Sequence, residues 1–222
     1  MKLLLHALPL LLLLQSQARI FTNKDGKKID AEYVEATETH VLLKLKKNGR
    51  SYSVEISKFS DDDITFITET RDEIAKTRDT IAKTKAENSK RVQVAEALVA
   101  FSEENKGKKV GDGECWTLAD KAYRHAKATR PSARVWGRIV DWENEPVLPG
   151  DILELVAAKF SNGAKSGPKH TAIVMSKGRR GSFTVYHQNW GSPGKTVSEY
   201  EFDLNQLASG EAIVYRFALE DE

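Results

Sequence analysis

The sequence has little cysteine: among its 222 residues, only Cys115 carries a thiol. A single cysteine excludes an internal disulfide. In an oxidising compartment a lone thiol is a liability unless it is buried or used, because exposed thiols are readily oxidised there. Cys115 is therefore either an inert buried side chain or a functional one.

The chain also lacks a dominant charge of one sign. It has 34 Lys and Arg against 32 Asp and Glu, which gives a net charge of +2, and both signs are mixed along its length. Without a basic block, the sequence gives little support for nucleic-acid binding. Apolar residues make up 40% of the chain, which is enough for a packed core, and the length indicates one or two domains.

Long apolar runs are absent after residue 14, so we expect the mature protein not to span a membrane. The one apolar run, residues 3–14, follows Lys2 and is too short to cross a bilayer. Ser16 and Ala18 then place small residues at the spacing of a cleavage site. These features predict a signal peptide over residues 1–18 and a secreted or periplasmic protein; the alternative is a short membrane anchor.

Residues 19–68 show the pattern of short strands joined by tight turns. Asn23 to Gly26 and Asn48-Gly49 are turn sequences, because glycine takes a positive φ without strain. Tyr52, Val54 and Ile56 alternate with polar residues, which is typical of a strand with one buried face. Short strands within about 40 residues favour a small SH3-like β-barrel.

The next segment has the pattern of a helix. Ser60 and Asp63 stand at the spacing of a helix cap, and a seven-residue repeat then places Ile67, Ile74 and Ile81 on one face. A coiled coil needs two strong apolar positions in each heptad, and this repeat supplies one. We therefore interpret residues 69–105 as a charged, solvated helical linker, with a dimerising zipper as the alternative.

Residues 106–222 are predicted to form a second domain. A helical pattern runs from Cys115 to Lys127, and strand patterns dominate from Leu148 onward. A helix followed by an antiparallel sheet indicates an α+β fold.

Within this domain, Cys115 lies at the predicted start of the helix, just after Gly113. The helix dipole and the free N–H groups of a first turn favour a thiolate over a thiol. The same N–H groups can hold an oxyanion during acyl transfer. The position suits a nucleophile, while the alternative remains a buried, inert cysteine.

Three further residues are candidates for the same site. His170 precedes an apolar strand, where it could face a helix start and act as a general base. His187 or Asn189, from the next strand, could orient the His170 ring. Cys115, His170 and His187 could also ligate zinc, but their spacings match no zinc motif, so we expect no metal and no cofactor.

Four segments carry a resemblance to a known family: residues 113–120 (GECWTLAD), 148–152 (LPGDI), 169–174 (KHTAIV) and 186–190 (YHQNW). They resemble the CHAP and NlpC group of papain-like peptidoglycan amidases and endopeptidases. They resemble still more closely the cysteine-proteinase-fold domain of fungal Bbc/Aim actin-patch proteins. The resemblance implies a papain-like fold with Cys115 as nucleophile, His170 as base, and His187 or Asn189 as the third member.

The sequence departs from the CHAP pattern at three places. His187 stands where CHAP enzymes usually have Glu, and Lys169 replaces the Gly before the His. Glu114 replaces a common Gln, and a carboxylate beside the thiol disfavours the thiolate. Two functions therefore stay open: a secreted cysteine hydrolase cutting an amide bond in a peptide or peptidoglycan, and a catalytically inactive papain-fold binding module of the cell envelope.

The first domain has a resemblance of its own. Residues 19–27, 48–52 and 57–63 are similar to the first homology domain of Sla-type adaptors, an SH3-like barrel. The resemblance implies a recognition module with a protein or peptide ligand.

The charged repeat gives a first prediction, on limited proteolysis of the whole chain. We expect the first cuts to fall between Arg71 and Lys90, because a solvated helix with one apolar position per heptad opens more easily than a packed domain. Mass spectrometry of the early fragments measures the cut sites. First cuts within residues 110–215 would contradict this division into domains.

Overall fold

The computed structural model describes residues 18–133, 135–177, 179–191 and 194–219. The signal peptide predicted over residues 1–18 lies outside them apart from Ala18. The chain divides into two compact units, 1–87 and 88–222. Each is described by itself, and the four-part division predicted from the sequence stays a prediction.

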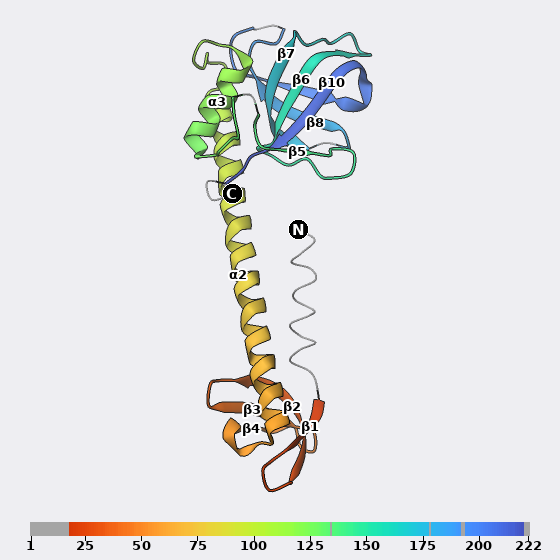
Figure 1. Cartoon of the computed structure of the whole chain (residues 1–222). Coiled ribbons are helices and arrows are strands. Elements are labelled where there is room, and N and C mark those ends of the chain that lie inside the picture. Colours follow the sequence, from red (N-terminus) through yellow and green to blue (C-terminus); the bar gives the residue numbers. More distant parts are fainter. Residues whose placement is uncertain (1–17, 134, 178, 192–193, 220–222) are drawn as a thin grey trace. The chain divides into compact units, whose positions relative to one another are not determined.

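The first unit contains an antiparallel meander in which each strand pairs with the next along the chain (Figure 1). Gly26 and Gly49 take positive φ angles of 78° and 69° in two of the connections, as the turn sequences predict. A short 3-10 helix, η1, follows the last strand. The strands are β1 (Ala18–Thr22), β2 (Lys28–Ala36), β3 (His40–Leu45) and β4 (Ser51–Glu55), and η1 spans Ile56–Lys58.

The core of this unit joins the sheet to the start of a long helix, α2 (Asp61–Glu104). Ile67 and Ile74 of the predicted heptad face are buried there, against residues that include Phe21, Tyr33 and Leu43. The two isoleucines thus cover the sheet. An SH3-like barrel stays a prediction for this unit.

One expectation about the sheet holds for two of its three residues, because Ile56 is buried and Val54 packs against the core. The alternation of Tyr52, Val54 and Ile56 predicted a buried face, but Tyr52 is 44% exposed although its cross-strand partner Leu43 is fully buried. The physical reason is that β4 is the last strand of the sheet, so one of its sides has no neighbouring strand to cover it.

The start of α2 is tied to the sheet by Asp63. Its backbone N–H donates to the Ser60 hydroxyl (3.4 Å), which confirms the predicted cap. Its carboxylate accepts hydrogen bonds from the Thr22 N–H (2.7 Å) and the Ser60 hydroxyl (3.0 Å), and pairs with Arg19 Nη2 at 2.7 Å. Helix and first strand are therefore held together by one buried carboxylate.

Helix α2 continues without interruption to Glu104, and Val94 and Leu98 near its end are buried in the core of the second unit. None of the helices in the described residues is long and apolar enough to cross a membrane.

The second unit combines α2's last turns and a second helix, α3 (Cys115–Ala126), with one six-stranded antiparallel sheet, so the predicted α+β class is confirmed (Figure 1). The strand order is β5-β10-β6-β7-β8-β9. The strands are β5 (Arg138–Val140), β6 (Ile152–Phe160), β7 (Lys169–Lys177), β8 (Ser182–His187), β9 (Ser198–Asp203) and β10 (Leu207–Arg216).

This sheet has two buried faces with separate cores. The helix face packs against α3 and includes Ile152, Ile173 and Tyr186. The far face carries the second core, which includes Leu155 and Val174 among its residues. Because successive side chains of a strand point to opposite faces, neighbours along β7 belong to different cores.

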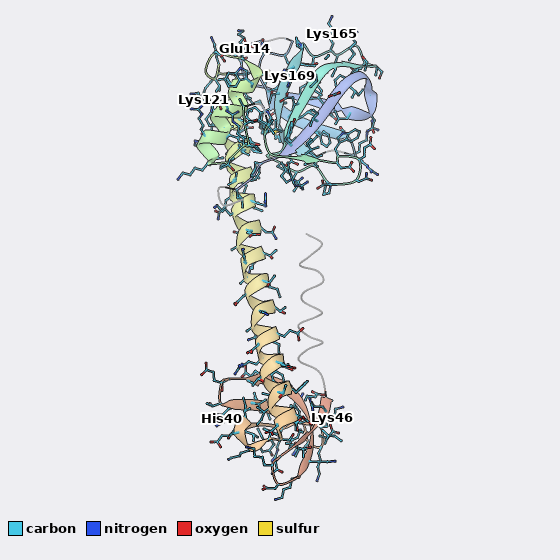
Figure 2. The ribbon with its side chains drawn as sticks, viewed as in Figure 1. His40, Lys46, Glu114, Lys121, Lys165 and Lys169 are labelled. Atoms are coloured by element: carbon cyan, nitrogen blue, oxygen red, sulfur yellow. The ribbon has the colours of Figure 1, made fainter. Side chains whose placement is uncertain are left out.

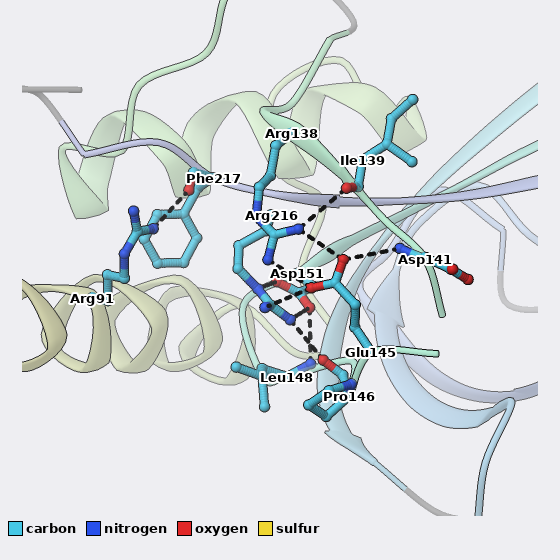
Figure 3. A network of polar contacts seen from close by, with 10 residues as sticks. All are labelled: Arg91, Arg138, Ile139, Asp141, Glu145, Pro146, Leu148, Asp151, Arg216 and Phe217. Atoms are coloured by element: carbon cyan, nitrogen blue, oxygen red, sulfur yellow. Dashed lines mark hydrogen bonds and ion pairs between the residues drawn. The ribbon is translucent and has the colours of Figure 1, made fainter. Parts of the chain in front are cut away.

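A buried ion pair fixes the turn that leads into β6 (Figure 3). The Asp151 carboxylate accepts two bonds from Arg216, at 2.9 and 2.8 Å, and one from the Leu148 N–H at 2.8 Å. Burial raises the pKa of Asp151 even though Arg216 opposes the shift. At the rim, Arg138 donates twice to Glu145 and lowers the pKa of that carboxyl to about 2. The Asp151–Arg216 pair thereby anchors β10 to the start of β6.

This network gives a stability prediction. Asp151→Ala leaves the Arg216 guanidinium buried without its carboxylate, so we expect a loss of about 3 kcal/mol in the free energy of unfolding. Urea unfolding followed by tryptophan fluorescence measures the effect. All four tryptophans, at positions 116, 136, 142 and 190, lie in the second unit, so the signal reports on that unit alone.

The matched control is Arg179→Ala, which breaks the exposed pair with Asp203. It should leave the urea midpoint nearly unchanged. Equal effects of the two substitutions would show that the Asp151 pair adds nothing beyond an exposed one.

Candidate functional site

Cys115 is the first residue of α3, as the sequence predicts. The preceding Glu114 has an extended backbone and its side chain makes no capping hydrogen bond. The loop before it is held by Asp112, whose Oδ1 accepts bonds from the Thr117 hydroxyl (2.6 Å) and the Glu114 N–H (3.0 Å). The thiol is therefore fixed at the N-terminus of a 12-residue helix.

Gln188 clamps the same loop from the sheet. Its side-chain amide donates to the carbonyl oxygens of Val110 (3.0 Å) and Glu114 (2.7 Å), and its oxygen accepts from the Val110 N–H (3.2 Å). Gln188 is fully buried. With its amide engaged at both ends, it positions the start of α3 rather than binding a ligand.

The residue that faces the thiol from the sheet is Thr171. Thr171 and Cys115 line the same cavity; burial raises the pKa of the thiol, while hydrogen bonding from Thr171 and from the Trp116 backbone opposes that rise. Thr171 pairs across the strands with Glu154, whose carboxylate accepts from the Trp136 indole N–H at 3.2 Å. Since Trp136 belongs to the core under α3, this cross-strand pair lies on the helix face of the sheet.

His170 lies on the far face instead. It pairs with Leu155, a member of the far-face core, and its ring centroid is 4.6 Å from that of Trp190 and 5.4 Å from that of His187. The side chain is only 3% exposed, and its Nε2 has no hydrogen-bond partner. Within the described part of the chain, no hydrogen bond joins His170 to Cys115.

His187 and Asn189, the two candidates for orienting His170, lie in different surroundings. His187 is buried beside His170; its Nε2 lies 3.4 Å from the Ser198 hydroxyl and its Nδ1 has no partner. Asn189 does not contact the His170 ring through a hydrogen bond but donates to Glu114 Oε2 at 2.7 Å. The two histidines are thus in contact, while Asn189 holds the Glu114 side chain in the loop before α3.

A groove passes over the thiol. On one side, a cavity of about 470 Å³ is lined by residues that include Cys115, His170, Asn189 and Trp190. On the other, a cavity of about 600 Å³ is lined by Glu114, Cys115, Trp116, Glu154, Pro168, Lys169 and Thr171. Both share Glu114, Cys115, Pro168 and Lys169, so we call the pair of cavities the Cys115 groove. Figure 2 shows Glu114, Lys165 and Lys169 at the same end of the second unit.

The comparison with family models matches residues 86–221 to the AIM3/BBC1 cysteine proteinase-fold domain. The match covers more than half of the chain. The chain belongs to this family. The resemblance to the Bbc/Aim domain is therefore confirmed, while the likeness to CHAP and NlpC enzymes and to Sla-type domains stays a prediction. No curated protein and no solved structure matched the chain.

The AIM3/BBC1 domain holds site residues that the sequence reasoning missed. Thr171 and Gln188 directly follow the predicted His170 and His187, Thr171 within β7 and Gln188 just after the end of β8. The sequence offered a signal for Glu154, a charged residue inside the apolar run of β6; its Oε1 accepts from Lys169 Nζ at 2.8 Å. No comparable signal distinguishes Thr171 from His170.

Desolvation dominates the electrostatics of the AIM3/BBC1 domain's site. Burial raises the pKa of the Cys115 thiol and the Glu114 carboxylate adds to the rise, against the Thr171 hydrogen bonds. Burial also lowers the pKa of His170 to about 3, with a smaller contribution from His187, and that of His187 to about 4. At neutral pH the thiol is protonated and both imidazoles are uncharged.

The described residues contain no group of three His, Cys, Asp or Glu side chains that could hold a metal ion. The zinc alternative would need Cys115 beside both histidines, but the cavity that the thiol shares with His170 is not lined by His187.

The buried histidines give a prediction on acid stability. The ordinary histidine pKa is 6.5, so below it the unfolded chain binds protons that the folded His170 and His187 do not. Stability should therefore fall as the pH drops from 6.5 toward 4, by up to about 1.4 kcal/mol per pH unit for each histidine. Tryptophan-monitored urea unfolding at pH 7, 6 and 5 measures the slope.

The control is the pair of single substitutions His170→Gln and His187→Gln. Each should flatten the slope by about half, whatever it does to stability at pH 7. A slope between pH 6.5 and 5 that neither substitution changes would mean that other groups carry it.

Proposed function

We propose that the AIM3/BBC1 domain of this chain is a non-catalytic module that binds an extended peptide segment in the Cys115 groove. The observation that carries the proposal is that Thr171, and not a base, lies on the helix face of the sheet and lines a cavity with Cys115. A hydrolase of this fold class needs a base at that place to take the thiol proton. The Thr171 hydroxyl is too weak a base to do so at neutral pH.

The electrostatics support the same reading. A nucleophilic cysteine requires a lowered thiol pKa, whereas burial raises the pKa of Cys115. His170 has no hydrogen bond to the thiol, and its pKa of about 3 makes it a weak proton acceptor at neutral pH.

The groove has the features of a recognition surface. The Trp116 side chain is 37% exposed beside the thiol, and its ring offers apolar area to a ligand at low entropic cost. Pro168 and Lys169 line the same cavity. A cleft of this kind, part apolar and part polar, is typical of ligand sites.

A second candidate is the secreted cysteine hydrolase, acting on an amide bond in a peptide or in peptidoglycan. It is favoured by one observation: Cys115 and His170 line the same cavity. For His170 to reach the thiol, its ring would have to leave the aromatic cluster of Trp190 and Phe202.

The remaining parts of the proposal rest on sequence patterns. We propose that the chain is exported, which the charged residue Lys2 and the apolar residues 3–14 support. We also propose that residues 19–68 form an SH3-like recognition module for a protein or peptide, supported by their resemblance to Sla-type domains.

Alkylation of Cys115 by iodoacetamide between pH 6 and pH 10 tests the function. We expect slow reaction at pH 6 and a rise only at or above the ordinary thiol pKa of about 8.5, because the folded thiol stays protonated. His170→Ala should not change this profile, and neither should the control His125→Ala on the exposed side of α3.

A gain-of-function variant sharpens the experiment. Thr171→His places an imidazole where the structure has the hydroxyl, so it should shift the alkylation profile to lower pH. Fast alkylation of the unaltered protein at pH 6 that His170→Ala abolishes would instead establish a Cys–His site and overturn the binding-module proposal.

A further inference from the structure

The two ends of the Cys115 groove differ in charge. The end near Trp190 is lined by Lys165, Lys169 and Glu114 as its charged residues. The end near Trp116 has Lys169 with the two carboxylates Glu114 and Glu154. Lys169 is paired with Glu154 at 2.8 Å and Glu114 with Lys195 at 2.6 Å, so Lys165 gives the Trp190 end its excess of positive charge.

We infer that the Trp190 end of the groove binds a carboxylate, so that the ligand of this domain is an acidic peptide segment. The inference rests on the proposed function and names its ligand class. Three observations carry it: Lys165 has no acidic partner at this end among the described residues, the Glu114 side chain does not cap the start of α3, and the buried His170 lines the cavity.

The single carboxylate at this end is already neutralised. Glu114 Oε1 pairs with Lys195 Nζ at 2.6 Å, and Glu114 Oε2 accepts the Asn189 amide at 2.7 Å. Lys165 is exposed, and the ion pairs of the described residues include none with its ammonium. An incoming carboxylate thus meets one cation that has no competing acid.

The start of α3 adds a second attraction. The Glu114 side chain is drawn to Lys195 and does not cap the helix. The Thr117 N–H donates to the Glu114 carbonyl instead, at 3.1 Å, and the N-terminal end of the helix dipole favours an anion beside Cys115. An acidic ligand would place a carboxylate at this helix N-terminus, where the Glu114 side chain makes no cap.

The third observation is independent of both. His170 lines this cavity, is more than nine-tenths buried, and leaves its Nε2 without a hydrogen-bond partner. Leaving a buried polar atom unpaired costs free energy, and a ligand recovers it once the ring turns to expose Nε2, which has almost no accessible surface in this structure.

Nuclear magnetic resonance titration of the full chain tests this inference. The probes are two blocked alanine pentapeptides, one with glutamate at its centre and one with glutamine there. We expect the glutamate peptide to shift the Trp190 indole signal and to bind about tenfold more tightly than its glutamine twin. Its affinity should fall when sodium chloride is raised.

The matched variants are Lys165→Gln in the groove and Lys121→Gln on α3, both exposed lysines labelled in Figure 2. Lys165→Gln should weaken binding of the glutamate peptide about three- to tenfold, and Lys121→Gln should leave it unchanged.

Three results overturn the inference: equal binding of the two peptides, equal effects of the two lysine variants, and no binding of either peptide. Equal binding of both peptides with shifts at Trp190 would leave the peptide-binding function standing. The proposed function fails by a separate measurement, the fast alkylation of Cys115 at pH 6 through His170.

Discussion

The register between β6 and β7 is the constraint on which the site depends. It pairs Glu154 with Thr171 and Leu155 with His170. Because side chains alternate along a strand, this register places Thr171 under α3 and His170 in the far-face core. A shift of one residue would exchange the two and put an imidazole against the thiol. The chemistry available to Cys115 is therefore set by strand pairing.

Several buried polar residues hold that register in place. Asp151 and Arg216 fix the turn before β6, and the backbone of the same turn exchanges hydrogen bonds with β7: the Gly150 N–H donates to the Val174 carbonyl, and the Val174 N–H to the Asp151 carbonyl, each at 2.8 Å. Gly150 has a φ of 86° and lies close to Ala95: a Cβ added to Gly150 would come within 2.9 Å of the Ala95 Cα. Gln188 then attaches the start of α3 to the sheet.

Burial, rather than charge pairing, governs the titration of the site. The thiol is partly buried and both imidazoles are buried, none of them with an opposite charge as partner among the residues described, and each pKa moves toward the neutral form. An active cysteine hydrolase requires the opposite arrangement, in which thiolate and imidazolium stabilise each other. The domain thus combines a fold suited to cysteine chemistry with an environment that leaves the thiol unactivated, which is compatible with a groove kept for binding.

The sequence by itself determined the α+β class, the helix that begins at Cys115, the cap at Ser60 and the resemblance that family membership confirmed. These features are local, because neighbouring residues along the chain set caps, turns and hydrophobic periodicity. It also proposed His187 or Asn189 as the residue that orients His170; the ring centroids of His170 and His187 lie 5.4 Å apart, and Asn189 bonds to Glu114 instead. Only the tertiary structure decided which of two adjacent residues, His170 or Thr171, meets the thiol. Both residues fit a buried strand, and the choice depends on long-range register and on what α3 covers, neither of which any local pattern specifies.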